Sequence, residues 1–358
     1  MKKLILLINL LTFGVILSYA QQPVSWEHIS SKNGRIEAPN DGNQQTSAAV
    51  ADFDNDGIND FVITERTQAP AISLYLRKKS GWKKLVVEKE ALEIEAGTTA
   101  CDVDGDGDGK TDLVFWAQGD NTLYFTRIPE NPKELSAWKL IPAYTYYTDS
   151  QMEQVGKYPG WKGINEHEGL DKADIDGDGV QDIVGGGMWF KYIGNDRFSF
   201  NIIDEAYTFS RSAAGQVIKG GRPEVILVVG DGRAPLNLYE YQKGTWVKRE
   251  ILPLVENGHS LSLIDFNGDG NMDIWNAEMT LGGNTDAVNH ILLGDGMGNF
   301  PDEILISKGI DLHESEIADL DGDGDLDILG KPYDGNAPRL DIWLQNGTGS
   351  RYDLNKKK

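Results

Sequence analysis

Short runs of β-branched and aromatic residues alternate with polar positions along most of the chain, and segments rich in Asp and Gly separate them. This period-two alternation predicts β-strands joined by turns. Residues 47–63 are expected to form two strands around an Asp-rich loop, and two more strands are expected at Ile72 to Leu76 and Trp82 to Val87. One structural unit therefore has four strands.

The same unit recurs along the chain. The later units span residues 97–142, 166–204, 215–251 and 259–306, and a last one starts at His313. In the second unit the outer strands are expected at Leu123 to Ile128 and Trp138 to Ile141. In the fourth unit all four strands are expected, at Gly215 to Ile218, Glu224 to Val229, Leu236 to Tyr241 and Trp246 to Ile251.

The two ends of the chain complement each other. The last unit ends with Leu340 to Gln345 and is one strand short, whereas residues 24–29 form a strand with no partner nearby. Joining that strand to the last unit would close a ring and protect the sheet edges. We therefore predict an all-β fold, a single β-propeller over residues 21–358. Six blades are counted, and seven would require a blade without the loop motif.

Five loops share one spacing of oxygen-bearing side chains, at positions 1, 3, 5 and 9, with Gly at position 6. Calcium binds six to eight oxygen atoms, and Gly allows the positive φ that so tight a loop needs. The flanking segments are strands, which distinguishes these loops from EF-hands. We expect up to five structural calcium ions. Their ligands would be Asp52, Asp54, Asp56, Asp60, Asp104, Asp106, Asp108, Asp112, Asp174, Asp176, Asp178, Asp182, Asp265, Asn267, Asp269, Asp273, Asp319, Asp321, Asp323 and Asp327.

The fourth unit has KGGRPE, residues 219–224, in place of the Asp residues and should bind no calcium. The five intact loops, each followed by a short apolar strand, resemble FG-GAP/VCBS repeats over nearly the whole chain after residue 20. The resemblance implies a calcium-loop propeller, usually with seven blades. Such repeats occur in integrin-type adhesion heads, lectin-like proteins, some polysaccharide lyases and the propeller of aldos-2-ulose dehydratase, so the resemblance does not define one function.

Met1 to Ala20 has the charged start, apolar core and small-residue end of a signal peptide. We therefore expect a secreted or periplasmic protein without a membrane span. Cys101 is the single cysteine, which excludes an internal disulfide. The formal net charge is −22 and no basic stripe is present, which argues against nucleic acid as a partner.

Each Asp-rich loop lies at one end of its hairpin, so the residues before the first strand and after the second lie at the other end. If these strands are innermost, those residues surround one mouth of the central channel. The residues before the strands are His167, Glu168, His259 and His313. Those after the strands are Glu65, Trp116, Trp189, Arg233, Glu278 and Lys331. An aromatic segment at 143–165, which includes Tyr146, should overhang the same mouth.

The candidates for acid–base catalysis are His167, His259, His313, Lys331 and Glu278. The histidines could instead hold a further divalent metal, or form hydrogen bonds between blades. The candidates for substrate binding are Glu65, Trp116, Trp189, Arg233, Glu168 and Tyr146. The tryptophans could stack on sugar rings or pack between blades, and the charged residues could be solvated rim charges.

Three functions fit these residues. The first is an enzyme acting on carbohydrate, a lyase or dehydratase that removes a proton next to a carboxylate or carbonyl. The second is a non-catalytic carbohydrate-binding propeller, and the third is an adhesion or scaffold module for another protein. Clustered His with Lys and Glu favours the first, whereas a broad exposed apolar patch would favour the third.

Overall fold

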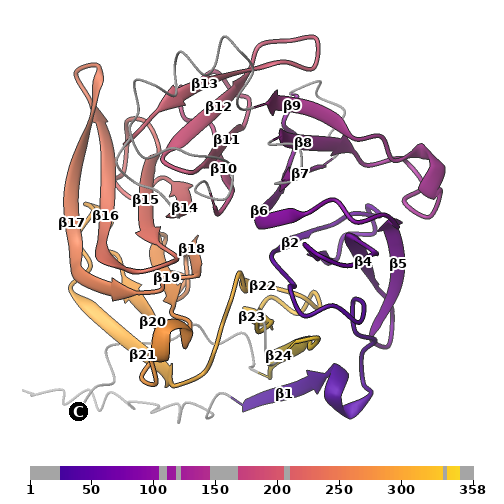
Figure 1. Ribbon diagram of the computed structural model, residues 1–358. Helices are drawn as coiled ribbons and strands as arrows, with labels where there is room; N and C mark the ends of the chain where they lie inside the picture. Colours follow the sequence, from indigo (N-terminus) through magenta and orange to yellow (C-terminus); the bar gives the residue numbers. More distant parts are fainter. Residues whose placement is uncertain are drawn as a thin grey trace, which may run out of the picture.

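Six antiparallel four-stranded sheets form a ring in the computed structural model, which describes residues 25–104, 111–117, 122–145, 168–204, 210–333 and 337–346 (Figure 1). Each sheet is one blade of a β-propeller. The innermost strands β2, β6, β10, β14, β18 and β22 surround the central axis (Figure 1). The fold class and the count of six blades predicted from the sequence are thereby confirmed.

The strands follow one another radially outwards within each blade. Blade 1 comprises β2 (Ala48–Ala51), β3 (Asp60–Thr64), β4 (Ile72–Arg77) and β5 (Trp82–Glu88). Blade 2 comprises β6 (Ile94–Cys101), β7 (Asp112–Ala117), β8 (Thr122–Arg127) and β9 (Ile141–Thr145). Blade 3 comprises β10 (Asp171–Ala173), β11 (Asp182–Gly185), β12 (Met188–Tyr192) and β13 (Phe198–Ile202).

The second half of the ring repeats this order. Blade 4 comprises β14 (Ser210–Gly215), β15 (Glu224–Val229), β16 (Arg233–Gln242) and β17 (Thr245–Glu256). Blade 5 comprises β18 (Ser260–Ile264), β19 (Asp273–Ala277), β20 (Val288–Leu293) and β21 (Asp302–Lys308). Blade 6 comprises β22 (Glu316–Ala318), β23 (Asp327–Gly330), β24 (Asp341–Asn346) and β1 (Ser25–Ser30).

The N-terminal strand closes the ring as predicted. β1 pairs antiparallel with β24, from Ser25 opposite Asn346 to Ser30 opposite Asp341. The last blade thus takes its outer strand from the start of the chain, which covers an edge that would otherwise stay unpaired.

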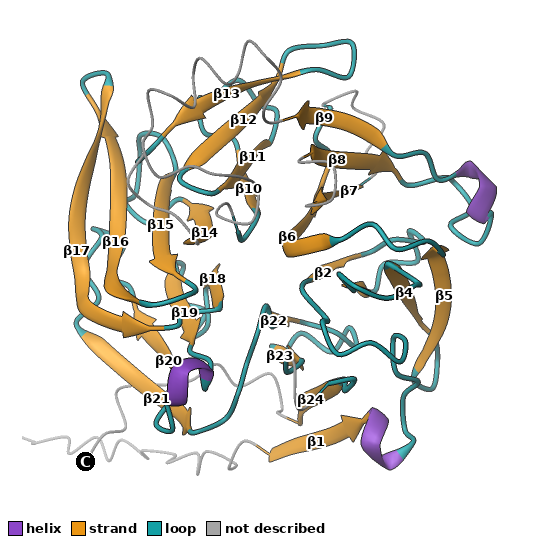
Figure 2. Cartoon of the chain, viewed as in Figure 1, coloured by secondary structure: helices purple, strands orange, loops and turns teal. Residues whose placement is uncertain are grey.

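Helical structure among the described residues is limited to three short 3₁₀ turns (Figure 2). They are η1 (Ser31–Asn33), η3 (Leu135–Ala137) and η5 (Leu281–Gly283). Within the described part of the chain, no helix is long and apolar enough to span a membrane.

Two predicted strands are displaced. Trp138 does not begin the outer strand of blade 2, because its indole N–H donates to the carbonyl of Pro132 and its buried ring follows the turn η3. The strand begins at Ile141. In blade 4 the first strand is β14, which precedes the predicted segment Gly215 to Ile218, because Gln216 to Ile218 belong to the loop that replaces the Asp motif.

The hydrophobic core lies between adjacent blades rather than at the ring centre. The cluster between blades 2 and 3, for example, joins Trp116 and Phe125 of one blade to Phe190 and Phe198 of the next. Strand alternation produces this arrangement, because successive side chains of a strand face the two neighbouring blades. The axis is consequently left for the ends of the innermost strands and for polar residues.

Candidate functional site

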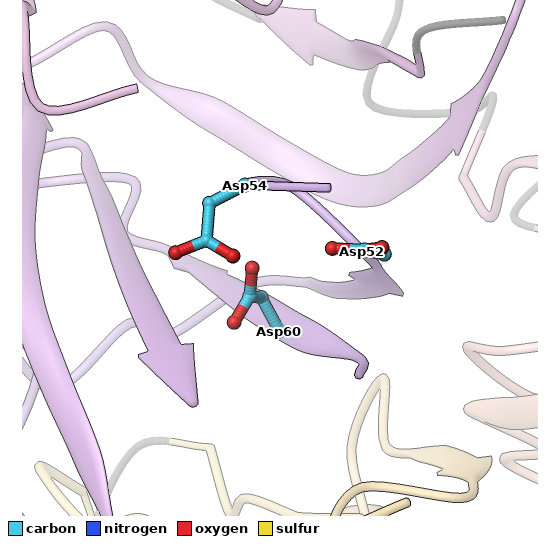
Figure 3. A group of neighbouring side chains, drawn as sticks. All are labelled: Asp52, Asp54 and Asp60. Carbon is cyan, nitrogen blue, oxygen red and sulfur yellow. The ribbon is translucent and has the colours of Figure 1, made fainter. Parts of the chain in front are cut away.

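Asp side chains converge in the loops at one end of the ring. In the first loop, Asp52, Asp54 and Asp60 each place a carboxylate oxygen within 4.8 Å of the others (Figure 3). Equally close groups are Asp102, Asp104 and Asp112; Asp174, Asp176 and Asp182; and Asp319, Asp321 and Asp327. The spacing had not indicated Asp102, and the predicted ligands Asp106 and Asp108 lie outside the described residues.

The backbone of the loop explains the spacing. Asp60, at position 9, accepts the N–H of Phe53 at 3.0 Å and that of Arg77 at 2.6 Å, which ties the loop to the strands. Asp52, at position 1, accepts the N–H of Gly57 at 2.8 Å. Gly57 has φ of +89°, which residues with a side chain rarely adopt. The equivalent position-9 contacts are made by Asp112, Asp182, Asp273 and Asp327.

The aspartates at position 5 accept the backbone N–H two residues later; they are Asp56, Asp178, Asp269 and Asp323. The fourth motif, in blade 5, has Asn267 at position 3, and its amide oxygen accepts the N–H of Asp269 at 2.9 Å. Asp265 of the same loop accepts the N–H of Gly270 at 3.0 Å. The described parts of the five motifs therefore share one loop design.

Three loops leave a buried carboxylate oxygen without a hydrogen-bond partner, Oδ1 of Asp54, Asp176 and Asp321. Such an oxygen is costly to bury, and a hard divalent cation would compensate that cost. Burial also raises the pKa of Asp60 to about 7, which a neighbouring cation would oppose. The donor set in these loops therefore fits calcium.

Blade 4 keeps the loop backbone but has no carboxylate at positions 1, 3 and 5. Glu224 stands at position 9 and accepts the N–H groups of Val217 and Ile218 at 2.9 Å each. Gly221 stands at position 6 with φ of +88°. Position 1 is Gln216 and position 3 is Ile218, so the loop offers no carboxylate pair for a cation.

At the opposite end of the ring, a cavity of about 190 Å³ opens at the mouth of the central channel. All six blades contribute side chains to this mouth cavity. Its lining consists of Arg66, Glu95, Glu168, Asp231, His259, Met279, Leu281, His313 and Tyr333. The ends of the hairpins thus converge as the sequence argument predicted.

Arg211, the second residue of β14, links acidic residues of two other blades at the mouth. Its guanidinium is 2 % exposed and forms ion pairs with Glu168, at 2.7 Å, and with Glu314. Burial nevertheless raises the pKa of Glu168 to about 8, because the loss of water outweighs the attraction of Arg211. Glu168 is therefore a carboxyl group that can carry a proton near neutral pH.

His259 has both ring nitrogens engaged. Nε2 contacts Asp231 Oδ1 at 2.8 Å and Nδ1 contacts the Arg211 guanidinium at 2.6 Å. Since Arg211 can only donate, we assign the proton of the neutral ring to Nε2. Burial and the Arg211 charge lower the pKa of His259 to about 4. The hydrogen bond from His259 in turn lowers the pKa of Asp231.

His313 lies between two rings in the same cavity. It stacks on His259 and on Tyr333, with centroid distances of 4.7 Å in both cases. Its Nδ1 is 3.3 Å from Nζ of Lys331, and the described residues supply no hydrogen-bond partner for Nε2. Burial and the Lys331 charge hold the pKa of His313 well below its usual value. A neutral imidazole with one free nitrogen therefore faces the cavity.

Lys331 is 1 % exposed and is surrounded by three acceptors. Its Nζ lies 2.7 Å from the carbonyl of Gln45, 2.9 Å from that of His313, and 3.3 Å from the His313 ring. Burial lowers the pKa of Lys331 to about 7. The lysine can therefore exchange its proton in the neutral range.

Arg66 also lines the mouth cavity. Its guanidinium binds both carboxylate oxygens of Glu95, at 2.6 and 2.7 Å, and donates to the hydroxyl of Tyr333. The Tyr333 hydroxyl is thus oriented by the Arg66 guanidinium, while the Tyr333 ring stacks on His313.

Four predicted residues meet at the mouth: His259, His313, Lys331 and Glu168. Two predicted carboxylates accept hydrogen bonds from backbone N–H groups instead. Glu65 accepts the N–H groups of Gln44, Thr67 and Gln68, and Glu278 accepts those of Glu256 and Val288. His167 and Tyr146 lie outside the described residues.

The remaining predicted residues lie away from the mouth cavity. Trp116 is fully buried and packs edge-on against Phe190 at 5.7 Å, which corresponds to the interblade alternative. Trp189 lines a different cavity between blades 3 and 4. Arg233 has a 63 % exposed side chain and pairs with Glu256 at 3.3 Å.

Sequence reasoning missed Arg66, Glu95, Arg211, Asp231 and Tyr333. Arg66 and Asp231 follow the ends of β3 and β15, so the offset that located the histidines contains the signal for them. Arg211 was missed because the first strand of blade 4 was expected to start at Gly215. The start of that strand could not be predicted, because the loop that follows it lacks the Asp motif.

The second proposed metal has a weaker geometric basis than the loops. Among the described residues, the compact groups of three metal-ligating side chains all lie in the Asp-rich loops. At the mouth, His259 would have to give up a hydrogen bond to Arg211 or Asp231 to bind a metal.

Comparisons with known proteins agree with this fold. Residues 221–275 match the FG-GAP-like repeat, a segment that joins blade 4 to the first hairpin of blade 5. Curated proteins gave no significant match by sequence.

Solved structures show the same architecture at very low sequence identity. An α-L-arabinanase of Penicillium chrysogenum in complex with arabinobiose superposes with a TM-score of 0.56 and 10 % identity, over 88 % of this chain and 97 % of that one. AofleA from Arthrobotrys oligospora superposes with a TM-score of 0.54 and 10 % identity, over 92 % and 88 %. At such identities the likeness concerns the fold alone. The FG-GAP-like repeat match and the ring of six blades together support an FG-GAP β-propeller family for this chain.

Proposed function

We propose that this protein is an exported enzyme that acts on carbohydrate at the mouth cavity. The observation that carries the proposal is the free ring nitrogen of His313, held between His259 and Tyr333 in a cavity that Arg66 also lines. A base, a hydroxyl and a guanidinium in one small cavity suit acid–base chemistry on a sugar. The arabinobiose complex of the similar P. chrysogenum propeller is consistent with a sugar as the ligand.

The reaction we propose is elimination, as in a lyase or dehydratase. His313 Nε2 would take the proton from the carbon next to a carboxylate or carbonyl. The electron pair of that C–H bond forms the new C=C bond, and the C–O bond at the next carbon breaks. The leaving oxygen takes a proton from an acid, for which Tyr333 and the protonated Glu168 are the candidates, and Arg66 would stabilise the developing negative charge.

Lys331 sets the protonation of His313. As a neutral amine it donates to the carbonyls of Gln45 and His313 and accepts the Nδ1 proton of the ring, so Nε2 is a free base. As an ammonium it donates to Nδ1, and Nε2 then carries the proton. We therefore assign Lys331 a positioning role and His313 the catalytic one.

Calcium in the Asp-rich loops is proposed as structural. The orphaned carboxylate oxygens of Asp54, Asp176 and Asp321 support this assignment. The ions would lie at the end of the ring opposite the mouth cavity and would stabilise the hairpins that carry the mouth residues.

Glycoside hydrolysis is the second candidate. Glu168 and Asp231 line the same cavity, and their environments shift their pKa values in opposite directions, to about 8 for Glu168 and downward for Asp231. A protonated acid beside an ionised carboxylate is the pair that a glycosidase uses.

One assay separates these functions. Purified protein with calcium is incubated with uronic-acid polysaccharides, keto-sugars and neutral arabinans, while absorbance near 235 nm and reducing ends are both recorded. Rising absorbance establishes elimination, because the new double bond is conjugated to a carboxylate or carbonyl. New reducing ends without absorbance establish hydrolysis. If neither signal develops, the enzymatic proposal is wrong and a non-catalytic binding propeller takes its place.

A further inference from the structure

A second and larger cavity lies between blades 3 and 4, with a volume of about 660 Å³. Residues of β12 and β13 line one side, and residues of the β16–β17 hairpin line the other. It shares no lining residue with the mouth cavity. We call it the interblade cavity.

Aromatic side chains from both blades line the interblade cavity. Trp189 comes from β12, and Tyr241 and Trp246 pair directly across β16 and β17. The rings of Tyr241 and Trp246 meet nearly edge to face at 5.3 Å. The guanidinium of Arg222 lies over Tyr241, 4.6 Å from the ring centroid. Flat apolar faces are thus present on both walls, with a cation at the rim.

Several polar atoms of the lining have no hydrogen-bond partner within the part of the chain that the structure describes. Among the described residues, none forms a hydrogen bond with the indole N–H of Trp189 or Trp246, the Tyr241 hydroxyl or the Asn201 amide. Asn201 lies opposite Trp189 across β12 and β13, so both side chains lie on the same face of the sheet. Aromatic faces combined with free donors and acceptors match a ligand whose rings have an apolar face and hydroxyl groups around the edge.

We propose that the interblade cavity binds an oligosaccharide segment, separate from the mouth cavity. The free N–H, O–H and amide groups would bind sugar hydroxyls while the Trp faces cover the sugar rings. Arg222 is the charged side chain of the lining, which suits a neutral or acidic glycan rather than a basic one. The inference does not depend on catalysis at the mouth.

The test is retention of the full-length protein in native gels that contain arabinan, xylan, laminarin or alginate, followed by titration calorimetry with the polysaccharide that retards it. We expect Trp246→Ala and Tyr241→Ala each to weaken binding at least tenfold. The matched control is Val247→Ala, because Val247 follows Trp246 on β17, is 42 % exposed and faces the other way. It should bind as the wild type does.

Three further variants show that any loss of binding comes neither from misfolding nor from the mouth cavity. Trp246→Phe and Tyr241→Phe keep the packing but remove the polar heads, and each should still weaken binding measurably. His313→Gln, at the mouth, should leave this binding intact even if it abolishes catalysis. If none of the four polysaccharides retards the protein, or if the Trp246 and Tyr241 variants bind like the wild type, the interblade site is wrong.

Discussion

His259 and His313 stack with ring centroids 4.7 Å apart and an interplanar angle of 29°, although they precede the innermost strands of two different blades. The stack places a ring whose nitrogens are both engaged beneath a ring with one nitrogen free. Burial keeps both rings neutral near pH 7, since it lowers the pKa of each. His313 is therefore the residue from which the function can be tested most directly.

Replacing His313 by Gln should lower the rate of the mouth reaction by about 10²- to 10⁴-fold, the usual contribution of a general acid or base. The thermal midpoint should change little, because Gln keeps a polar side chain of similar length. His28→Gln is the control, since His28 lies on β1 with a half-exposed side chain paired to Asp341. Full activity of the His313 variant would move the chemistry to another residue.

The activity should rise with pH through about 7. Burial lowers the pKa of Lys331 to about 7, so deprotonation frees Nε2 of His313 as a base in that range. The charges that act on Lys331 are those of Glu314, Arg211, Glu316 and Glu65. In Lys331→Met this limb of the pH–rate profile should disappear. If the rate of the Lys331→Met variant still rises with pH through about 7, a different group is responsible for that rise.

Replacing Arg211 by Met should destabilise the fold by about 3–5 kcal/mol, because Glu168 and Glu314 would lose their buried partner. Arg233→Met is the matched control. The Arg233 side chain is 63 % exposed, so its ion pair with Glu256 should contribute within about 0.5 kcal/mol. Urea unfolding at pH 7 measures both, and equal losses for the two variants would refute the central role of Arg211.

Calcium should raise the melting temperature, and chelation should lower it. A site saturated at 100 times its dissociation constant stabilises by about 2.7 kcal/mol. Asp176→Asn, which removes charge at position 3 of the third loop, should reduce the calcium-dependent part of the stability. Asp302→Asn, on the exposed strand β21, should leave it unchanged. A melting temperature that changes with neither calcium nor chelator would contradict the assignment.

Blade 4 should be insensitive to calcium, because protein contacts replace the ion there. Lys219 N–H donates to the carbonyl of Gly296 at 3.0 Å, and Arg249 donates to the carbonyl of Gly298 and to Asn299. We expect Arg249→Ala to cost about 1 kcal/mol in the presence and in the absence of calcium. Glu250→Ala, the next residue along β17, is the control for loss of a surface charge. A cost that vanishes with calcium present would show that the loop binds an ion after all.

Much of the fold could be read from the sequence because its determinants are local. The positions of Asp and Gly within nine residues define each loop, and alternation of apolar residues defines the strands on either side. The lone strand near residue 25 and the incomplete last unit were enough to predict the closure by β1 and β24. Local reasoning failed where the loop motif is lost, which shifted β14 and hid Arg211.

The candidate site was only partly predictable. His259, His313 and Lys331 were found because they stand at a fixed offset from a loop. Trp189 has a similar offset, yet it lines the interblade cavity instead. Glu65 and Glu278 also have the right position but bind backbone N–H groups. Sequence position gives the end of the ring on which a residue lies, but not the direction in which its side chain points.

By itself, the sequence determined the blade units, the Asp-rich loops, the closing strand and the end of the ring where polar residues gather, because each depends on residues close together in the chain. Only the tertiary structure decided which of those residues meet. The pairing of Arg211 with Glu168 and Glu314, and the stacking of His313 on His259, join residues from different blades. Such contacts depend on the curvature of the whole ring, and no local pattern encodes them.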